Sequence, residues 1–403
     1  MKHLLLLTDG MADYKIPLLG NKTPLQYAKT PNMDAIAPHS KVGMVHTIPE
    51  GYPPGSDVAN MSVMGYAPQN YYTGRSPLEA VSLGVDLGSA DLALRCNLVT
   101  LSEEKDYSEK TMLDYSAGEI STEESAQLVA ALQAELNSNL FAFHPGISYR
   151  HLTVWKDAMG KTPVLTPPHD ISDRKIKDYL PSGDDANHIL DLMQRSEKIL
   201  RNHPINIARE EKGLHPATSI WLWGEGSRPS LDAFNDKYDL DGAVVCAVDL
   251  VRGLGICAGL TPVSVEGGTG AVKTNFAGKA KAAIDQLKQG KDFVYLHIES
   301  PDEAGHQGEP QTKVWSIEQI DQEVLGYILT EMASFDDFRL MILPDHPTPL
   351  SLKTHTSEPV PFMIYDKNHP EEGPTQYNEE TAANGPFISS GPELLRKFLS
   401  GKW

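Results

Sequence analysis

The sequence predicts an α/β fold with a mostly parallel sheet. Apolar runs of strand length alternate with longer amphipathic stretches along the chain. Such alternation indicates a parallel sheet, because each helix returns the chain to the edge where the next strand begins. Several apolar runs are also followed by Asp or His. Open α/β sheets bind ligands beyond the carboxyl ends of their strands, so these residues are candidates for a site.

The expected strands are the apolar runs of four to eight residues bounded by turn-forming residues. They are His3–Leu7, Tyr149–Trp155, Ser219–Trp223, Ala243–Val248, Phe293–Ile298, Leu340–Leu343 and Pro361–Tyr365. Helices are expected where apolar residues recur with helical spacing, and one of them opens with the capping-box pattern Ser121-Thr-Glu-Glu124. The expected helices are 121–136, 184–201, 276–287 and 314–333.

Composition restricts the class of function. The 403 residues exceed one ordinary core, since domains average about 150 residues. The formal charge is −19, and the acidic residues are spread along the chain. A nucleic-acid partner is therefore not expected, because phosphates require a basic face. An anionic small molecule remains possible where metal cations or arginines reverse the local field.

Cysteine usage and hydropathy predict a soluble cytoplasmic protein. Cys96, Cys246 and Cys257 are the three cysteines, an odd number without CxxC spacing, so neither a disulfide framework nor a thiolate metal site is indicated. The apolar run Leu4–Leu7 is too short for a signal peptide. No run of about 18 apolar residues occurs, so no membrane association is expected.

The motif Pro301-Asp-Glu-Ala-Gly-His306 follows the expected strand 293–298. Asp302 and His306 are four residues apart, so they can share one face of a helical turn and offer a carboxylate and an imidazole to a divalent cation. The spacing fits equally well with an ordinary helix N-terminus, where Asp302 is an acidic first-turn residue and His306 is solvated.

Two further strand ends carry potential ligands. Asp345 and His346 follow the expected strand 340–343, and His355 comes nine residues after His346. Asp9 follows the strand His3–Leu7, although Asp9-Gly10 alone could be a simple turn. Because these residues are expected at one edge of the sheet, a site with more than one metal ion is the better interpretation of the group.

Ser56 is the candidate nucleophile. Pro53-Pro54-Gly55 interrupts the chain before it, which places Ser56 at the start of the next helix. Backbone N–H groups and the helix dipole could hold a phosphoryl oxygen there. A serine hydroxyl needs a base or a metal ion to become a good nucleophile. Spacing does not separate this role from simple helix capping.

The middle of the chain offers groups that could bind an anion. Arginines pair with carboxylates and phosphates through two hydrogen bonds, and the rigid loop Thr166-Pro-Pro-His-Asp170 presents two further polar side chains. Each of these could also be an ordinary surface charge. The candidates are Arg75, Arg95, Arg150, His169 and Asp170.

The position of the candidate ligands predicts two domains. They lie near the beginning of the chain and in its last quarter, whereas the middle carries none. We therefore expect a discontinuous metal-binding domain formed by residues 1–75 and 263–403, and a smaller inserted α/β domain formed by residues 76–262 for the substrate.

A series of ordered motifs extends almost from end to end of the chain. They are Asp9-Gly10, Gly55-Ser-Asp-Val-Ala-Asn60, Tyr71-Tyr-Thr-Gly-Arg-Ser-Pro-Leu-Glu79, Arg95-Cys-Asn97, Tyr149-Arg-His-Leu152, Thr166-Pro-Pro-His-Asp170, Pro301-Asp-Glu-Ala-Gly-His306, Pro344-Asp-His346 and Thr354-His-Thr356. With these motifs the chain resembles the archaeal-type cofactor-independent phosphoglycerate mutases.

The resemblance implies an alkaline-phosphatase-like domain with helices on both faces of its sheet. It also implies two divalent ions, manganese, zinc or magnesium, and no 2,3-bisphosphoglycerate. One ion would be held by Asp9, Ser56, Asp345 and His346, and the other by Asp302, His306 and His355. The implied reaction converts 3-phosphoglycerate to 2-phosphoglycerate through a phosphoserine at Ser56. The partner is thus a small phosphorylated metabolite, and no oligomeric state is predicted.

One segment departs from the family pattern. Mutases of this type typically carry Asp-Arg-Arg-Ala-Gly-Arg, whereas this chain has Asp114-Tyr-Ser-Ala-Gly-Glu119. A bacterial branch proposed to be homoserine kinases also lacks these arginines, so a homoserine kinase-like phosphotransferase is one alternative. A non-catalytic metal-binding relative is another. The mutase is the preferred interpretation, because the kinase would need a nucleotide site that the sequence does not reveal.

Overall fold

A computed structural model describes all 403 residues, which form two compact units. The first unit combines Met1–Tyr72 with Ser230–Trp403, and the second is Thr73–Pro229. The C-terminal boundary of the insert, expected at residue 262, lies at Pro229 in the structure. The reason is that the strand Gly242–Val245 pairs with Phe293–Ile298 in the sheet of the first unit.

The first unit is built on an eight-stranded sheet with the order β11-β10-β12-β1-β13-β14-β2-β15. Every strand pair is parallel except the two that involve β14. This confirms the predicted α/β class with a mostly parallel sheet. The strands are β1 Lys2–Thr8, β2 Ser40–Val45, β10 Gly242–Val245, β11 Thr261–Val263, β12 Phe293–Ile298, β13 Phe338–Leu343, β14 Val360–Asp366 and β15 Phe387–Ile388.

Helices pack on both faces of this sheet. Leu4 and Leu6 of β1 are fully buried in one core with Phe276 and Ile284. Leu5 and Leu7 point to the opposite face, because side chains alternate along a strand, and they are also fully buried. The helices of this unit are α1 Pro24–Tyr27, α2 Pro31–Ile36, α3 Ser56–Val63, α4 Pro68–Tyr71, α9 Phe234–Tyr238, α10 Asp249–Cys257, α11 Phe276–Lys288, α12 Ser300–Gln307, α13 Pro310–Gln319, α14 Gly326–Met332, α15 Glu379–Ala382 and α16 Gly391–Ser400.

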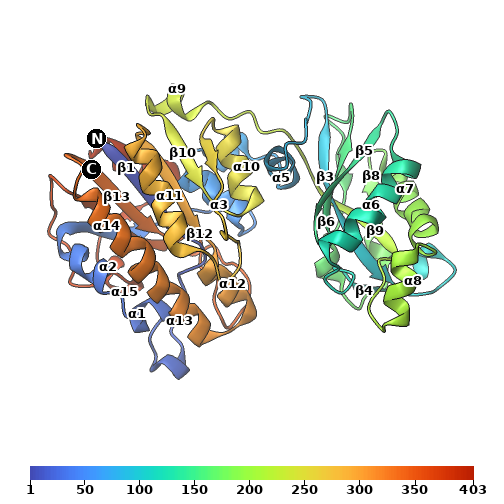
Figure 1. Cartoon of the computed structure of the whole chain (residues 1–403), viewed down its shortest axis with the longest axis horizontal. Helices are drawn as coiled ribbons and strands as arrows, with labels where there is room; N and C mark the ends of the chain where they lie inside the picture. Colours follow the sequence, from blue (N-terminus) through green and yellow to red (C-terminus); the bar gives the residue numbers. More distant parts are fainter. The chain divides into compact units, whose positions relative to one another are not determined.

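Figure 1 shows α11, α13 and α14 lying alongside the central strands of the first unit. The helix expected at 314–333 is not one regular α-helix: α13 and α14 are joined by a π-helical segment, Ile320–Leu325. Both termini of the chain lie at the same side of the unit (Figure 1), and the Nε2 of His3 lies 3.3 Å from the carbonyl oxygen of Leu399.

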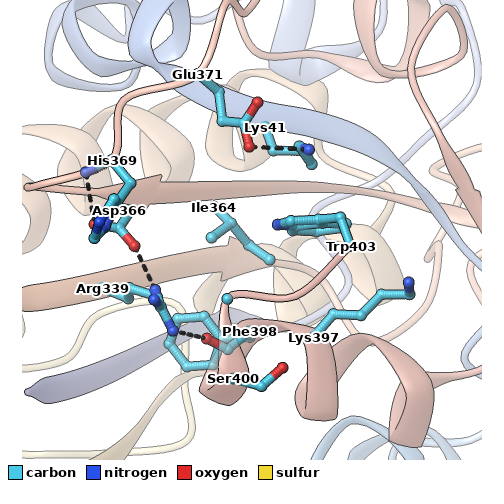
Figure 2. Close-up of a pocket in the computed structure, with 11 residues that line it drawn as sticks. Lys41, Arg339, Ile364, Asp366, His369, Glu371, Lys397, Phe398, Ser400 and Trp403 are labelled. Carbon is cyan, nitrogen blue, oxygen red and sulfur yellow. Dashed lines mark hydrogen bonds and ion pairs between the residues drawn. The ribbon is translucent and has the colours of Figure 1, made fainter.

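A cavity of about 280 Å³ lies at the opposite end of the sheet from the candidate ligands. Arg339 at the start of β13 is paired with Asp366 at the end of β14, and it also donates to the carbonyl oxygen of Phe398 (Figure 2). Lys41 is paired with Glu371 at 2.9 Å. The hydrogen bond from Arg339 to Phe398 joins α16 to β13.

The second unit contains an antiparallel sheet in which β3 pairs with β4, β6 and β9, and β5 pairs with β6. The predicted strands at 149–155 and 219–223 are present here, but they belong to an antiparallel sheet. The strands are β3 Leu92–Leu101, β4 Met112–Asp114, β5 Phe141–Ile147, β6 Arg150–Trp155, β7 Pro163–Val164, β8 Ser182–Gly183 and β9 Ser219–Ser227, and the helices are α5 Ser76–Ser82, α6 Thr122–Leu136, α7 Ala186–Leu200 and α8 Pro204–Glu211.

No disulfide bond links Cys96, Cys246 and Cys257. No helix combines the length and the apolar character needed to cross a membrane.

Candidate metal centre

The candidate ligands of the first unit meet at the carboxyl end of its sheet. β1 lies between β12 and β13, so the residues that follow these three strands are neighbours. Asp9 follows β1, Asp345 and His346 follow β13, and Asp302 is the third residue of α12, which begins soon after β12. Asp9, Asp345 and His346 are fully buried, and Asp302 is nearly so.

Gly10 allows this close approach. Its φ of 60° is in the left-handed region, and a Cβ at this position would lie 2.7 Å from the Cα of Asp302. The backbone N–H of Gly10 donates to Oδ1 of Asp345 at 3.2 Å. The Asp9-Gly10 turn therefore brings β1, α12 and the residue after β13 into contact.

Asp9, Asp345 and His346 form one potential ligand group. The Nε2 of His346 lies 3.6 Å from Oδ1 of Asp9 and 3.3 Å from Oδ2 of Asp345. The potential ligand atoms of these three residues all lie within 4.8 Å of one another. Asn60 donates to Oδ2 of Asp345 at 2.7 Å, and Tyr295 donates to Oδ1 of Asn60, so the carboxylate of Asp345 is held in place.

Ser56 faces this group from the first turn of α3. Its Oγ lies 3.1 Å from Nε2 of His346, and the residue is 7% exposed. The preceding Gly55 is the N-cap, and no side chain caps the helix, so Ser56 does not serve as a capping residue. The side chain of Asn60 also donates to the carbonyl oxygen of Ser56. Asn60 thus connects the start of α3 to Asp345.

Asp302, His306 and His355 form the second group. Oδ2 of Asp302 lies 3.2 Å from Nε2 of His306, and Oδ1 lies 3.5 Å from Nε2 of His355. The two imidazoles approach each other with their Nε2 atoms 2.9 Å apart. His346 also belongs to this neighbourhood, because its potential ligand atom lies within 4.8 Å of those of Asp302 and His355.

The buried carboxyl groups of this centre favour positive charge close to them. Burial, followed by the neighbouring charge of Asp345, raises the pKa of Asp9 well above its ordinary value. Burial also acts to raise the pKa of Asp302, but hydrogen bonds from His306 and His355 lower it well below that of a free carboxyl. The hydrogen bond to Asp302 raises the pKa of His306 to about 9. Divalent cations would offset the same negative charge.

The residues present therefore fit divalent cations. Carboxylate oxygens and imidazole nitrogens are the ligands that manganese, zinc and magnesium take in proteins. Oδ1 of Asp9 is buried without a hydrogen-bond partner, which is costly for a carboxylate unless a cation contacts it. All seven residues predicted as ligands from the sequence lie in these two groups or, in the case of Ser56, beside them.

Two residues of this centre were not predicted from the sequence. His297, the second-last residue of β12, lies with Nε2 2.8 Å from Oδ2 of Asp9, and Glu299 follows the same strand. Asp9, His297 and Glu299 form a third group within 4.8 Å. The available signal was the period of two: His297 and Glu299 are two apart and so share a face of the strand end.

The candidate substrate residues lie in the second unit, where three arginines approach one another. Arg95 on β3 is 8% exposed, and its Nε lies 3.2 Å from Glu79. Glu79 also pairs with Arg75 at 3.1 Å. The charges of Arg75 and Arg150 both act on Arg95, although burial is the larger cause of the lowered pKa of Arg95. The guanidinium of Arg95 lies over the ring of Trp223 at 4.7 Å.

His169 belongs to the same neighbourhood. Its ring contacts Trp223 with ring centroids 5.3 Å apart. Burial is the main cause of its lowered pKa, and the charges of Arg95 and Arg75 add to the effect. Asp170 follows with Oδ1 3.7 Å from Nε2 of His169. The structure therefore brings Arg75, Arg95, Arg150 and His169 together, with Asp170 next to His169. Glu79 and Trp223 were not predicted.

Comparisons with known proteins agree with this arrangement. A family model described as 2,3-bisphosphoglycerate-independent phosphoglycerate mutase matches residues 37–206. A Geobacter sulfurreducens protein named as a probable mutase of this kind is 50% identical over 401 residues, which cover 99% of this chain and 100% of that protein. The chain belongs to this family. A Methanosarcina barkeri mutase is 48% identical, with 96% of each chain covered.

Two solved structures share the fold of this chain. A Pyrococcus horikoshii protein has a TM-score of 0.84 and 29% identity, with 99% of this chain and 96% of that chain covered. A Thermoplasma acidophilum structure titled cofactor-independent phosphoglycerate mutase has a TM-score of 0.67 and 24% identity over the full length of both chains. The second likeness concerns the fold alone.

The segment from Asp114 to Glu119, which departs from the mutase pattern, lies beside His169. The ring of Tyr115 contacts that of His169 at 6.1 Å and that of Tyr149 at 6.0 Å. Asp114 fixes the turn by accepting hydrogen bonds from the N–H groups of Ser116 and Gly118. In this chain, the aromatic side chain of Tyr115 thus occupies a position where the family pattern has an arginine.

Proposed function

We propose that the chain interconverts 3-phosphoglycerate and 2-phosphoglycerate by phosphoryl transfer through a phosphoserine at Ser56. The observation that carries this proposal is the position of the Ser56 Oγ at the start of α3, 3.1 Å from His346, beside two groups of potential metal ligands. Membership of the family and the names of relatives that cover nearly the whole chain support the same activity.

Two divalent ions would be held by the residues of the first unit. Asp9, Ser56, Asp345 and His346 would hold one ion, and Asp302, His306 and His355 the other. When bound, such ions lower the pKa of a hydroxyl and offset charge on phosphoryl oxygens. Manganese, zinc or magnesium suits this set of oxygen and nitrogen ligands. No 2,3-bisphosphoglycerate is required, because Ser56 itself carries the phosphoryl group.

The residues of the chain divide the reaction into two transfers. The Oγ of Ser56 loses its proton and forms a bond to phosphorus, while the bond from phosphorus to the 3-oxygen of the substrate breaks and that oxygen takes up a proton. The resulting glycerate turns, its 2-hydroxyl loses its proton and bonds to phosphorus, and the bond from phosphorus to the Oγ of Ser56 breaks, so that Ser56 regains its proton. The N-terminal N–H groups of α3 favour the negative phosphoryl oxygens at Ser56. Asn60 fixes the position of Ser56 relative to Asp345 through its two hydrogen bonds.

We assign binding of the anionic substrate to Arg75, Arg95, Arg150, His169 and Asp170. Arginines suit a carboxylate or phosphate because they donate two parallel hydrogen bonds.

The names of the matching relatives favour the mutase over a homoserine kinase-like enzyme and over a non-catalytic relative. A cytoplasmic location remains a prediction, which the odd number of cysteines without CxxC spacing supports.

Trapping the phosphoserine tests this proposal. The manganese-loaded protein is mixed with 3-phosphoglycerate, quenched in acid within one turnover and digested, and the peptide that contains Ser56 is examined by mass spectrometry. A phosphorylated Ser56 is expected. Rapid mutase turnover with phosphorylation at another residue, or with none, would contradict the assigned nucleophile.

A further inference from the structure

Thr348 lies between the two groups of candidate metal ligands and belongs to neither. The residue is fully buried. Its Oγ1 lies 2.5 Å from Oδ1 of Asp302, in the second group, and 3.3 Å from Nδ1 of His346, in the first. We infer that Thr348 is a positioning residue, which links Asp302 to His346 and determines which nitrogen of His346 is free to face a cation and Ser56.

The backbone of Thr348 is held on both sides. Its N–H donates to the carbonyl oxygen of Ala12 at 3.2 Å, and its carbonyl oxygen accepts a hydrogen bond from Nζ of Lys313 at 2.8 Å. Lys313, on α13, is fully buried and also pairs with Asp13 at 2.8 Å. These contacts tie the segment that follows β13 to the segment that follows β1. Only the side chain of Thr348 remains to contact the ligands.

Two glycines allow this side chain to approach the ligands. A Cβ on Gly10 would lie 2.6 Å from Oγ1 of Thr348, and a Cβ on Gly305 would lie 2.8 Å from Cγ2 of Thr348. Both separations are shorter than a van der Waals contact, so a larger residue at either position would displace Thr348. The packing therefore restricts the position of the hydroxyl group.

The single proton of the Thr348 hydroxyl decides the direction of both hydrogen bonds. Asp302 as a carboxylate can only accept, so the hydroxyl donates to it, and this contact is the shorter of the two, as expected for a charged acceptor. Nδ1 of His346 must then donate its own proton to Oγ1. In a neutral imidazole this leaves Nε2 unprotonated. Nε2 is the nitrogen that lies 3.1 Å from Oγ of Ser56 and 3.3 Å from Oδ2 of Asp345.

An unprotonated Nε2 is what a metal ligand requires. A histidine ligand commonly donates its other N–H to a neighbouring group, which fixes the orientation of the ring. Thr348 would do this for His346 while its own proton holds Asp302, so one hydroxyl couples the two ligand groups. The simpler interpretation is that Thr348 only fills the space between Gly10 and Gly305. A valine, which has nearly the same shape, would then serve equally well.

Substitution at constant shape separates the two interpretations. Thr348→Val replaces the hydroxyl by a methyl group, whereas Thr348→Ser keeps the hydroxyl. Thr8→Val is the matched control, because Thr8 is fully buried next to Asp9 and its Oγ1 has no hydrogen-bond partner. The full-length protein is dialysed against a series of free Mn²⁺ concentrations, and bound manganese is measured by plasma mass spectrometry. Nitrogen NMR of the histidine-labelled, metal-free protein identifies the tautomer of His346, whose signal is assigned with His346→Gln.

Thr348→Val is expected to raise the Mn²⁺ concentration at half-saturation by about 10- to 100-fold, the usual cost of losing a group that orients a metal ligand. It should also move the proton of His346 from Nδ1 to Nε2, because Nδ1–H loses its acceptor. Thr348→Ser and Thr8→Val should resemble the wild type in both measurements. Wild-type affinity in Thr348→Val, an Nε2–H tautomer in the wild type, or an equal loss of affinity in Thr348→Ser would overturn the inference.

The inference rests on the proposed function, so mutase turnover is measured on the same samples. In Thr348→Val, kcat should fall by about 10- to 100-fold while KM for 3-phosphoglycerate stays unchanged, because a fully buried residue does not contact the substrate. Expected manganese binding and tautomers without turnover in the wild type would contradict the proposed function alone. Wild-type turnover together with unchanged manganese binding in Thr348→Val would contradict the inference alone.

Discussion

The Oγ of Ser56 lies 3.1 Å from Nε2 of His346, although the two residues are 290 positions apart in the chain. The contact exists because α3 begins beside the carboxyl end of the sheet, where β13 delivers His346. His346 in turn lies between the Asp9–Asp345 pair and the Asp302–His355 pair. A nucleophile placed at this point would lie beside cations held by either group, an arrangement that would favour phosphoryl transfer.

Ser56→Ala is expected to reduce turnover by about 10³-fold or more while the fold is retained, because it removes the atom that bonds to phosphorus. Ser62→Ala is the matched control. Ser62 lies in the same helix with a buried Oγ that has no hydrogen-bond partner, so its removal should leave both turnover and melting temperature nearly unchanged. Steady-state rates and circular dichroism check both variants. Equal losses in the two variants would indicate damage to α3 instead of loss of the nucleophile.

Removing divalent cations is expected to destabilise the protein, because Asp9, Asp302 and Asp345 then repel one another in a buried site. A ligand at about 100 times its Kd stabilises a protein by about 2.7 kcal/mol per site. Thermal unfolding with chelator and with added Mn²⁺ measures the difference. Asp345→Asn should reduce the shift produced by Mn²⁺. An undiminished Mn²⁺ shift in this variant would exclude Asp345 as a ligand.

Arg95→Lys is expected to raise KM for 3-phosphoglycerate by about 10- to 100-fold, because lysine cannot make the paired hydrogen bonds of a guanidinium. The ammonium still neutralises Glu79, so the fold should survive. Arg195→Lys, on the exposed side of α7, makes the same replacement away from the cluster and should leave KM unchanged. A KM for Arg95→Lys within twofold of wild type would show that the substrate binds elsewhere.

The buried side chain of His3 is expected to make the folded protein less stable in acid. Burial and the charge of Arg339 lower the pKa of His3 to about 4, from 6.5 for the unfolded chain. The unfolded chain therefore binds more protons between these values, so the free energy of unfolding falls as the pH drops from 6.5 to about 4, by about 3 kcal/mol for this residue. His3→Gln cannot titrate and should flatten the pH dependence of denaturant unfolding in that window.

The grouping of most residues of the candidate metal centre could be predicted because these residues follow recognisable strands. Asp9, Asp302 and Asp345 come after apolar runs that form β1, β12 and β13, and parallel strands bring their carboxyl ends to one edge. His297 was missed because it lies inside such a run, where only the strand order shows that its side chain meets Asp9. The position of His346 between two ligand groups likewise depends on packing that spacing does not reveal.

The second unit was less predictable. Helices between its strands suggested parallel pairing, but β3 pairs with β6 and β9 in antiparallel registers that depend on distant segments. This sheet brings Arg95 opposite Trp223, and the loop that carries His169 packs against the same ring. The sequence offered the arginines as candidates, but it did not point to Glu79, which pairs with two of them.

The most direct test of the central claim is an assay of the manganese-loaded protein with 3-phosphoglycerate as the sole phosphorylated compound, beside a parallel sample with homoserine and ATP. We predict formation of 2-phosphoglycerate without added 2,3-bisphosphoglycerate, and no phosphohomoserine. Formation of phosphohomoserine without any 2-phosphoglycerate would contradict the account, and it would mean that the segment from Asp114 to Glu119 marks a different substrate on the same metal centre.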